Sequence, residues 1–446
     1  MRSDSTDVAL AEIAADQPNA IAAGPFGSNL VSRDYVDSGT PVIRGQNLAG
    51  RWVAGEFVYV SDAKAAQLRS NTACPGDIVF TQRGTLGQVS IVPQGSYPSY
   101  IVSQSQMKMT VDARKADYRF VYYACSAPDF VAQVQNNAVA AGVPHINLGI
   151  LRALRIPLPA LTCQIKAVEV LSALDDRIDL LRQTNATLES IAQALFKSWF
   201  IDFDPVRAKA EGREPEGMDA ATAALFPSEF EESALGAIPK GWDVASIAEM
   251  CTRVSNGGTP SRSKPEFWAN GSVPWYKTGE LFDAHLLQPA ERITAQAVAN
   301  TSVKILPRHS VLMAIYAAPT VGRLGVLTEP SAFNQACTGM VSKAEIGPWF
   351  LFQTLLHGRE WFNSRANGAA QQNISKGIVE SYRCVRPTLS LLQAFNGVAD
   401  ALYASAERNG QQVAVLTDLR DALLPRLISG KLRLPEAQEQ IDEVCA

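Results

Sequence analysis

The sequence lacks the features that define several large classes of protein. It contains no run of about 18 or more apolar residues, so it predicts no membrane-spanning helix. Its first residues, MRSDSTDVALAEIAADQ, do not follow the basic-then-apolar pattern of a secretory signal. Its 7 cysteines show no CxxC spacing, which argues against both a cysteine-type zinc site and a disulfide framework. These absences predict a cytoplasmic protein without a metal site.

Motifs for catalysis are also missing. The chain has no GxGxxG or Walker A loop to hold a nucleotide, and no HExxH or GxSxG motif. An amino-methyltransferase would need a glycine loop for S-adenosylmethionine and an Asn/Asp-Pro-Pro-Tyr/Phe tetrad, which the nearest strings, NGGTP and DFDP, do not match. A nuclease-type pair of carboxylates near a lysine is not evident either. We therefore expect a protein that binds without being an enzyme by itself, and that carries no cofactor of its own.

What the chain does contain is a duplication. Residues 24–200 and 257–430 follow the same order of features, beginning with the Gly-rich loops GPFGSN and NGGTPS. A strand with a polar tip, an apolar strand with a second glycine turn, and a glutamine in register (Gln104 and Gln335) follow in each copy. Each copy ends in one long helix, so it consists of a head and a helix. A period of about 230 residues is far longer than the ~20–50 residues of a solenoid unit. The duplication predicts two similar heads, which suits an asymmetric, two-part target.

The two helices share a heptad pattern. In the first, apolar residues alternate in steps of three and four from Leu171 to Leu195, as on the a/d seam of a coiled coil. Asn185 occupies an a position, and Asn409 repeats it in the second helix. A buried Asn there fixes register and partner at some cost in stability. The second seam comprises Phe395, Val398, Leu402, Asn409, Leu416 and Leu419. We expect the helices, at about 164–200 and 392–428, to pair antiparallel within the chain.

Net charge is distributed unevenly along the sequence. The whole chain carries −4, which by itself does not favour a nucleic-acid partner. Counting Lys and Arg against Asp and Glu gives +1 for residues 1–159, −7 for 160–237, +5 for 238–388 and −3 for 389–446. The heads are thus neutral to basic, and the helices and linker are acidic. This distribution favours heads that meet phosphate and helices that meet protein.

Each head reads as short strands separated by glycine turns, followed by a helix. Candidate strands of the first head lie at residues 41–44, 57–60, 77–81, 88–92 and 107–111, and the candidate helices lie at 120–135 and 348–366. Spacing of about 10–20 residues between strands indicates a curved β structure rather than a parallel α/β sheet. The predicted fold class is α+β: two tandem mixed α/β domains, each followed by a long helix, with the helices forming an intramolecular antiparallel coiled coil.

Polar residues at turns beside these strands are candidates for contact with DNA. In the first head they are Arg33, Arg44, Gln46, Asn47, Gln82 and Arg83, and in the second Ser261, Arg262, Lys264, Tyr276, Lys277, Thr278 and Arg323. Arg and Lys can pair with guanine in the major groove, and Asn and Gln with adenine. The remaining candidates suit phosphate contacts. The alternative for each single residue is an ordinary solvated loop charge.

Two large aromatic residues stand at the end of the first helix. Trp199 and Phe200 belong to the string FKSWFIDFDPV, which precedes a charged, Pro- and Gly-rich connection. They either cap the coiled coil or form a surface that binds a partner protein. We carry the partner-binding alternative forward as a prediction.

Several strings resemble one protein family. IPKGWDVASIAEM opens the second copy, ALFKSWFIDFDPV follows the first helix, and LRDALLPRLISGKL ends the second. With the duplication, they make the chain similar to the specificity subunit of type I restriction–modification systems over essentially its whole length. The first copy departs from the pattern, because it begins at DVALAEIA without an IPKGW-type opening.

The resemblance implies a domain layout and a set of partners. Target-recognition domains would occupy residues 1–159 and 238–388, conserved helical regions 160–205 and 389–432, a linker 206–237 and a C-terminal tail 433–446. The implied partners are double-stranded DNA, two methylation subunits and two motor-nuclease subunits, with S-adenosylmethionine, ATP and Mg in those subunits. The alternative is a scaffold that does not bind DNA, or a specificity module of a related defence system.

Overall fold

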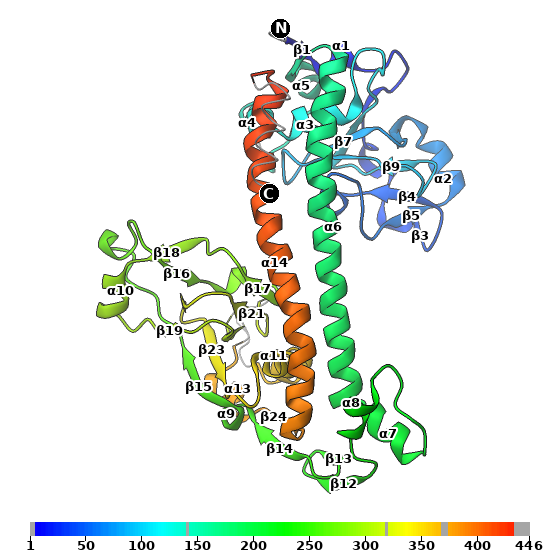
Figure 1. The fold of residues 1–446 in the computed structure, drawn as a ribbon. Coiled ribbons are helices and arrows are strands. Elements are labelled where there is room, and N and C mark those ends of the chain that lie inside the picture. The colour runs from blue at the N-terminus through cyan, green and yellow to red at the C-terminus, as the bar shows by residue number, and fades with distance from the viewer. Residues whose placement is uncertain (1–4, 140–141, 317–319, 367–372, 432–446) are drawn as a thin grey trace. The chain divides into compact units, whose positions relative to one another are not determined.

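The computed structural model describes residues 5–139, 142–316, 320–366 and 373–431. They form two compact units (Figure 1). Unit 1 comprises residues 1–178 and 414–446, and unit 2 comprises residues 179–413. Each unit therefore contains one head and part of both long helices, α6 (Leu161–Phe200) and α14 (Leu389–Ile428). The sequence predicted the helices as separate regions, whereas in the structure each helix is shared between the units. The predicted tail at 433–446 lies outside the described residues.

The described residues of the first head form three small sheets. One pairs β1 (Thr6–Ala9) with β11 (Arg155–Leu158), the second has the order β2 (Ile21–Ala23), β10 (Gln106–Met109), β7 (Ile78–Thr81), β8 (Val89–Ile91), and the third has the order β3 (Tyr35–Val36), β5 (Val58–Val60), β4 (Thr40–Ile43), β9 (Tyr100–Val102), β6 (Thr72–Ala73). All pairs are antiparallel except β4 with β9. The helices are α1 (Leu10–Ile13), α2 (Asp62–Gln67), α3 (Tyr118–Ser126), α4 (Pro128–Asn136) and α5 (Leu148–Ala153). All five predicted strands are present. The single helix predicted at 120–135 is two helices, because Pro128 begins a new one after the extended Ala127.

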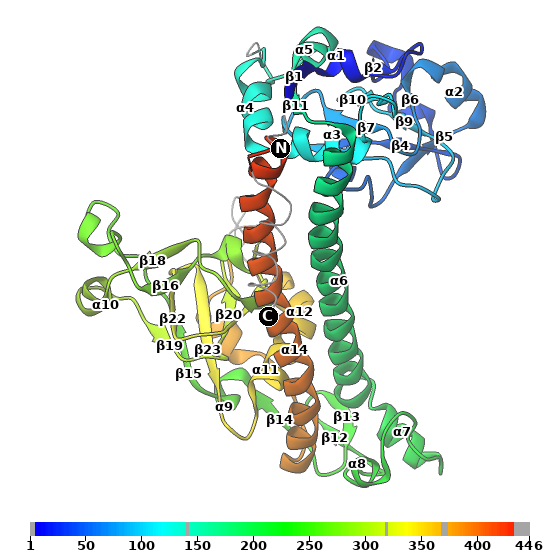
Figure 2. The ribbon, with the colours of Figure 1, turned by 45° about the horizontal axis from the view of Figure 1, so that its top comes forward.

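The second head repeats this plan. One sheet pairs β14 (Asp243–Ser246) with β24 (Arg383–Arg386). The second has the order β15 (Cys251–Asn256), β23 (Cys337–Ser342), β20 (Val311–Ala314), β21 (Leu324–Leu327), β17 (Ala284–Leu286). The third has the order β18 (Glu291–Ile293), β16 (Val273–Tyr276), β22 (Ser331–Phe333), β19 (Ile305–Leu306), of which Figure 2 shows β16, β22 and β19. The helices of the second head are α9 (Ile247–Met250), α10 (Ala295–Asn300), α11 (Pro348–His357), α12 (Arg359–Ser364) and α13 (Lys376–Ser381). The linker before it forms α7 (Asp204–Ala210), α8 (Ala220–Ala224) and the hairpin of β12 (Phe230–Ser233) and β13 (Gly236–Pro239). The helix predicted at 348–366 is interrupted at Gly358.

Local contacts confirm the duplication. In both heads the first strand pairs with the strand before the long helix, and an ion pair joins the two: Asp7 with Arg155, and Asp243 with Arg386. The first strand of the first head begins at Thr6, so the missing IPKGW-type opening does not remove this pairing. Both copies thus open with the same pairing, and their larger sheets differ by single strands: among the described residues, β3 occurs only in the first head and β17 only in the second.

The long helices pair antiparallel within each unit. In unit 2, Asn409 Nδ2 donates to Asn185 Oδ1 at 2.9 Å, and the rings of Phe196 and Phe395 lie 5.7 Å apart. Residues nearer the end of α6 therefore lie beside residues nearer the start of α14, as in an antiparallel pair. In unit 1, Arg420 pairs with Asp175 at 2.9 Å. The predicted Asn register is confirmed. Although each helix has 40 residues, no helix in the described parts of the chain is apolar enough to cross a membrane.

The predicted seam of α14 is wrong at one position. Val398 is 46% exposed, whereas Ala399 and Tyr403 are buried. Tyr403 stacks on Trp349 of α11, with ring centroids 4.1 Å apart. The second head also packs on α14, so the buried face of this helix turns away from a strict a/d stripe.

Trp199 and Phe200 lie in the core of unit 2. Trp199 is 5% exposed and its ring meets Phe226 edge-on at 5.1 Å. Phe200 is 3% exposed and lies 5.2 Å from Phe350 and 5.3 Å from Phe395. The prediction that these two rings form an exposed partner-binding surface is wrong, because residues of the linker and the second head cover them.

Candidate nucleic-acid interface

Several loops of the first head converge at one edge of its sheets. Because β4 and β9 are parallel, their carboxyl ends lie together, and Ser103 N donates to Ile43 O at 3.0 Å. The turn after β7 joins them, since Gln82 N donates to Ser105 O at 2.7 Å. The segment before α5 closes the set, with Ile146 N donating to Gln82 O at 3.0 Å. We call this edge the loop edge of the first head.

The Gly-rich loop is fixed onto the same edge. Gln104 Nε2 donates to the carbonyl oxygens of Gly27 and Leu30 at 2.6 and 2.9 Å. A Cβ atom on Gly24 would lie 1.8 Å from Ser103 O, so only glycine allows this approach. The loop presents Phe26, which is 89% exposed. In the sequence, only the position of Phe26 between Gly24 and Gly27 points to its exposure.

The predicted contact residues of the first head differ in accessibility. Arg33, Gln46 and Arg83 are exposed, and Arg44 and Gln82 are half-buried. The Nε atom of Arg44 is buried without a hydrogen-bond partner. All five lie in turns or strand ends, as predicted.

Asn47 has a structural position instead. It is 1% exposed, its Oδ1 accepts from Arg44 N at 2.9 Å, and its Nδ2 donates to the carbonyls of Ala54 and Glu56 at 2.9 and 3.0 Å. Its amide hydrogens are both used, so it shapes the turn after β4 and leaves our set of candidate DNA contacts.

The second head forms the equivalent loop edge. Asn334 N donates to Tyr276 O at 2.9 Å, and Ile315 N donates to Ala336 O at 2.8 Å. Gly257 repeats the close approach of Gly24, since an added Cβ would lie 2.2 Å from Phe333 O. The hydroxyl of Thr259 in the Gly-rich loop bonds to Gln335. The register of Gln104 and Gln335 is therefore confirmed, and both side chains hold a Gly-rich loop.

One exposed side chain of this edge was missed. The backbone of Ile315 makes the same two kinds of hydrogen bond as the backbone of Gln82 in the first head. Its N donates to Ala336 O at 2.8 Å, and its O accepts from Ile374 N at 2.8 Å. The next residue, Tyr316, is 39% exposed and occupies the place of Arg83. In the sequence, Tyr316 extends the apolar run VLMAIYAA, so it reads as part of a buried strand.

The predicted contact residues of the second head also differ in accessibility. Ser261, Arg262 and Lys264 are exposed, and Lys277, Thr278 and Arg323 are half-buried. The guanidinium of Arg323 lies 5.6 Å from the ring of Phe282, which is 67% exposed. Tyr276 is 1% exposed and its hydroxyl donates to Leu286 O at 3.0 Å. Tyr276 therefore belongs to the core and leaves the set of candidate DNA contacts.

Arg44 and Lys277 occupy equivalent positions, as predicted. Each stands at the start of the short 3-10 turn that follows its strand, and its backbone N donates to a side chain three residues on: Asn47 for Arg44 and Glu280 for Lys277. The same backbone thus carries a different cation in each head.

The chain is similar to known proteins over both heads. Residues 32–190 and 239–390 match the family described as the type I restriction modification DNA specificity domain. The chain belongs to this family. It is 28% identical over 331 residues to the specificity subunit of type I restriction enzyme HindI from Haemophilus influenzae, covering 65% of this chain and 71% of that protein. It is 23% identical over 426 residues to the MjaIX specificity subunit from Methanocaldococcus jannaschii, covering 93% and 92%.

A solved structure shares the fold. The type I restriction-modification S subunit from M. genitalium superposes with a TM-score of 0.57 at 13% identity, over 96% of both chains. The predicted family and fold class are therefore confirmed, and the chain is a specificity subunit of a type I restriction system.

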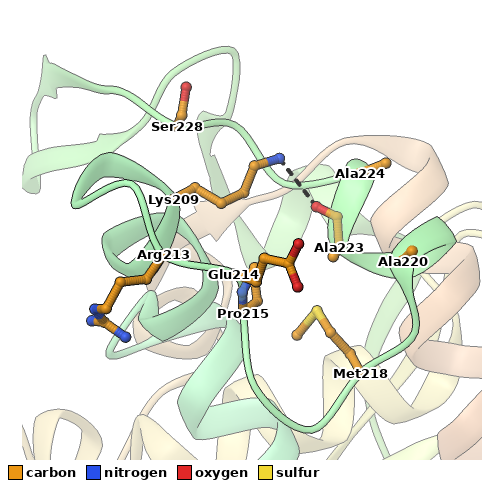
Figure 3. A pocket seen from close by; sticks show the side chains of 9 residues that line it. All are labelled: Lys209, Arg213, Glu214, Pro215, Met218, Ala220, Ala223, Ala224 and Ser228. Atoms are coloured by element: carbon orange, nitrogen blue, oxygen red, sulfur yellow. Dashed lines mark hydrogen bonds between the residues drawn. The ribbon is translucent and has the colours of Figure 1, made fainter.

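Away from the loop edges, this specificity subunit has a pocket of about 410 Å³ between α7 and α8 (Figure 3). Its lysine, Lys209, donates to the carbonyl of Ala223 at 3.1 Å and so joins the two helices. Its other lining residues are Arg213, Glu214, Pro215, Met218, Ala220, Ala224 and Ser228. Among the described residues, no group of three or more His, Cys, Asp or Glu side chains could hold a metal ion.

Proposed function

We propose that this subunit reads a bipartite, asymmetric site in double-stranded DNA, with one half-site for each head. One observation carries the proposal: the two loop edges share a backbone frame but present different side chains. Arg44 in one head corresponds to Lys277 in the other, and Arg83 corresponds to Tyr316. Since base edges are distinguished by side-chain donors and acceptors, different side chains on one frame recognise different sequences.

Each loop edge offers two kinds of contact. Exposed Arg and Lys side chains attract phosphates, and those that reach the major groove can pair with guanine. The exposed ring of Phe26 suits stacking against a base or insertion between base steps. Asn47 and Tyr276 are buried, and their hydrogen bonds to backbone carbonyls stabilise the turns that carry these exposed side chains.

We further propose that the helices dock the methylation subunits. Leu180 and Ile191 are 53% and 48% exposed on α6. They are 11 residues apart, which places them within about 20° on one helical face at 100° per residue. Exposed apolar side chains on one face fit a protein partner. S-adenosylmethionine, ATP and Mg would be bound by the methylation and motor-nuclease subunits, two of each, and the heads would aim the methylation without performing it.

The proposal is tested by exchanging one head. Residues 238–388 are replaced by the second head of a related specificity subunit, and methylated bases are mapped in cells that carry the complex. One half of the methylated site should change and the other should stay. A change in both halves, or in neither, contradicts one half-site for each head. Complete absence of DNA binding by the parent chain would favour a protein-binding scaffold instead.

A further inference from the structure

A carboxylate lies between two cations at the loop edge of the second head. Glu291 Oε1 accepts from Lys277 Nζ at 2.6 Å, and Glu291 Oε2 pairs with Arg262. The guanidinium of Arg262 also lies 3.6 Å from the ring centroid of Trp268, a cation–π contact. Arg262 and Lys277 are two of the predicted DNA contacts, so Glu291 fixes both of them.

Glu291 stays ionised. The hydrogen bond from Arg262, and then that from Lys277, lowers the pKa of this carboxyl to about 2. Its negative charge therefore persists at any pH at which DNA is bound. The three charged groups carry a net charge of +1 at the loop edge, where the two cations alone would carry +2.

The first head has an apolar residue at the position that matches Glu291. Glu291 pairs with Trp275 across β18 and β16, and the matching pair in the first head is Val58 with Val42. An apolar residue thus stands where the second head has an acid. The equivalent cation, Arg44, has a buried Nε without a hydrogen-bond partner. The two heads therefore present their cations to DNA in electrostatically different ways.

We propose that Glu291 is a specificity-determining residue of the second head, a role that rests on the proposed DNA reading. It holds Arg262 and Lys277 in one geometry, so that only a matching half-site meets them. It also cancels part of the positive charge that would attract phosphates of any sequence. Because it acts through the two cations, Glu291 is a positioning residue.

The physical consequence is a change in the balance between specific and non-specific binding. Non-specific affinity depends on the number of phosphates that cations neutralise, with a slope of about 0.9 in log salt for each phosphate. Releasing one cation to bind a phosphate would steepen the slope by about 0.9. Between two salt concentrations fourfold apart, that is a change of about 3.5-fold in affinity. Loss of the fixed geometry of the two cations would weaken binding to the matched site.

The test compares Glu291→Gln with Glu329→Gln in the full chain. Glu329 pairs with Arg292 at 3.6 Å and precedes β22 at the end away from the loop edge, so it controls for charge alone. Binding is measured to a duplex carrying the site mapped by methylated-base sequencing, and to a scrambled duplex of the same composition, over a range of salt. Thermal unfolding of each variant is measured in parallel.

We expect Glu291→Gln to strengthen binding to the scrambled duplex, to steepen its salt slope by about 0.9, and to reduce the preference for the mapped site about tenfold. Glu291→Asp keeps the charge but is shorter, so it should leave scrambled-duplex binding unchanged while losing preference. It also provides the comparison if Glu291→Gln unfolds early.

Each other outcome decides a different point. If Glu291→Gln matches Glu329→Gln in slope and preference, the inference is overturned. The same holds if Glu291→Asp strengthens scrambled-duplex binding, because charge would then not be the cause. If the parent chain shows no preference for the mapped site, the proposed function fails rather than the role of Glu291.

Discussion

Replacing Trp199 tests the distinction between core and partner surface. Its ring is 5% exposed and packs edge-on against Phe226 at 5.1 Å. Truncating such a buried ring leaves a cavity, and Trp-to-Ala changes in cores cost about 3–5 kcal/mol. At about 2–4 °C per kcal/mol for a unit of this size, Trp199→Ala should lower the unfolding midpoint of unit 2 by about 6–20 °C. Scanning calorimetry of the full chain measures this shift.

Ile191 provides the matched control on the same helix. It is 48% exposed, so Ile191→Ser should change stability by no more than about 0.5 kcal/mol. We expect Ile191→Ser to weaken co-purification with the methylation subunit, and Trp199→Ala to retain it below its unfolding temperature. An unchanged unfolding midpoint for Trp199→Ala, together with loss of the partner, would refute the placement of this ring in the core.

Three further predictions follow from individual side chains. Arg44→Ala should cost about 1–3 kcal/mol and relax one position of the site if the guanidinium reads a base, or reduce the salt slope by about one if it holds a phosphate; unchanged binding would remove Arg44 from the interface. Phe26→Ala should reduce affinity for the mapped site by about 1–3 kcal/mol without altering stability, as measured by titration and thermal unfolding; equal affinity would remove the ring from the DNA contact. Burial lowers the pKa of His285 to about 4, so the unfolded chain binds a proton at higher pH and stability falls as pH drops from about 6.5 toward 4. His285 alone should contribute a loss of about 2 kcal/mol between pH 7 and pH 5 in urea unfolding, and His285→Phe should reduce the pH-dependent loss by about that amount.

The family and the duplicated plan could be predicted from sequence because their signals are periodic or local. The a/d spacing placed both helices, and the repeated Asn set a register that the Asn185–Asn409 hydrogen bond satisfies. Glycine turns and short β-runs located the strands of the first head, since strand propensity and turn chemistry depend on neighbouring residues. Sequence also placed Arg44 and Lys277 at equivalent turns.

Burial, in contrast, was decided by residues distant in sequence. Trp199 and Phe200 stand at the end of a helix, where nothing local indicates that residues of the linker and the second head will cover them. The sequence predicted Asn47 as a DNA contact, but in the structure its amide donates to the carbonyl oxygens of Ala54 and Glu56. Tyr316 reads as core, yet it emerges at the loop edge.

The two similar heads and the two register-matched helices follow from the amino-acid sequence alone, because repetition and periodicity are properties of the chain. Which polar residues reach the surface, and how their charges combine, depends on tertiary packing. Glu291 meets Lys277 because β18 pairs with β16, across 14 residues of sequence, and it meets Arg262 across 29 residues. Strand pairing sets such distances, and the electrostatic character of each loop edge depends on them.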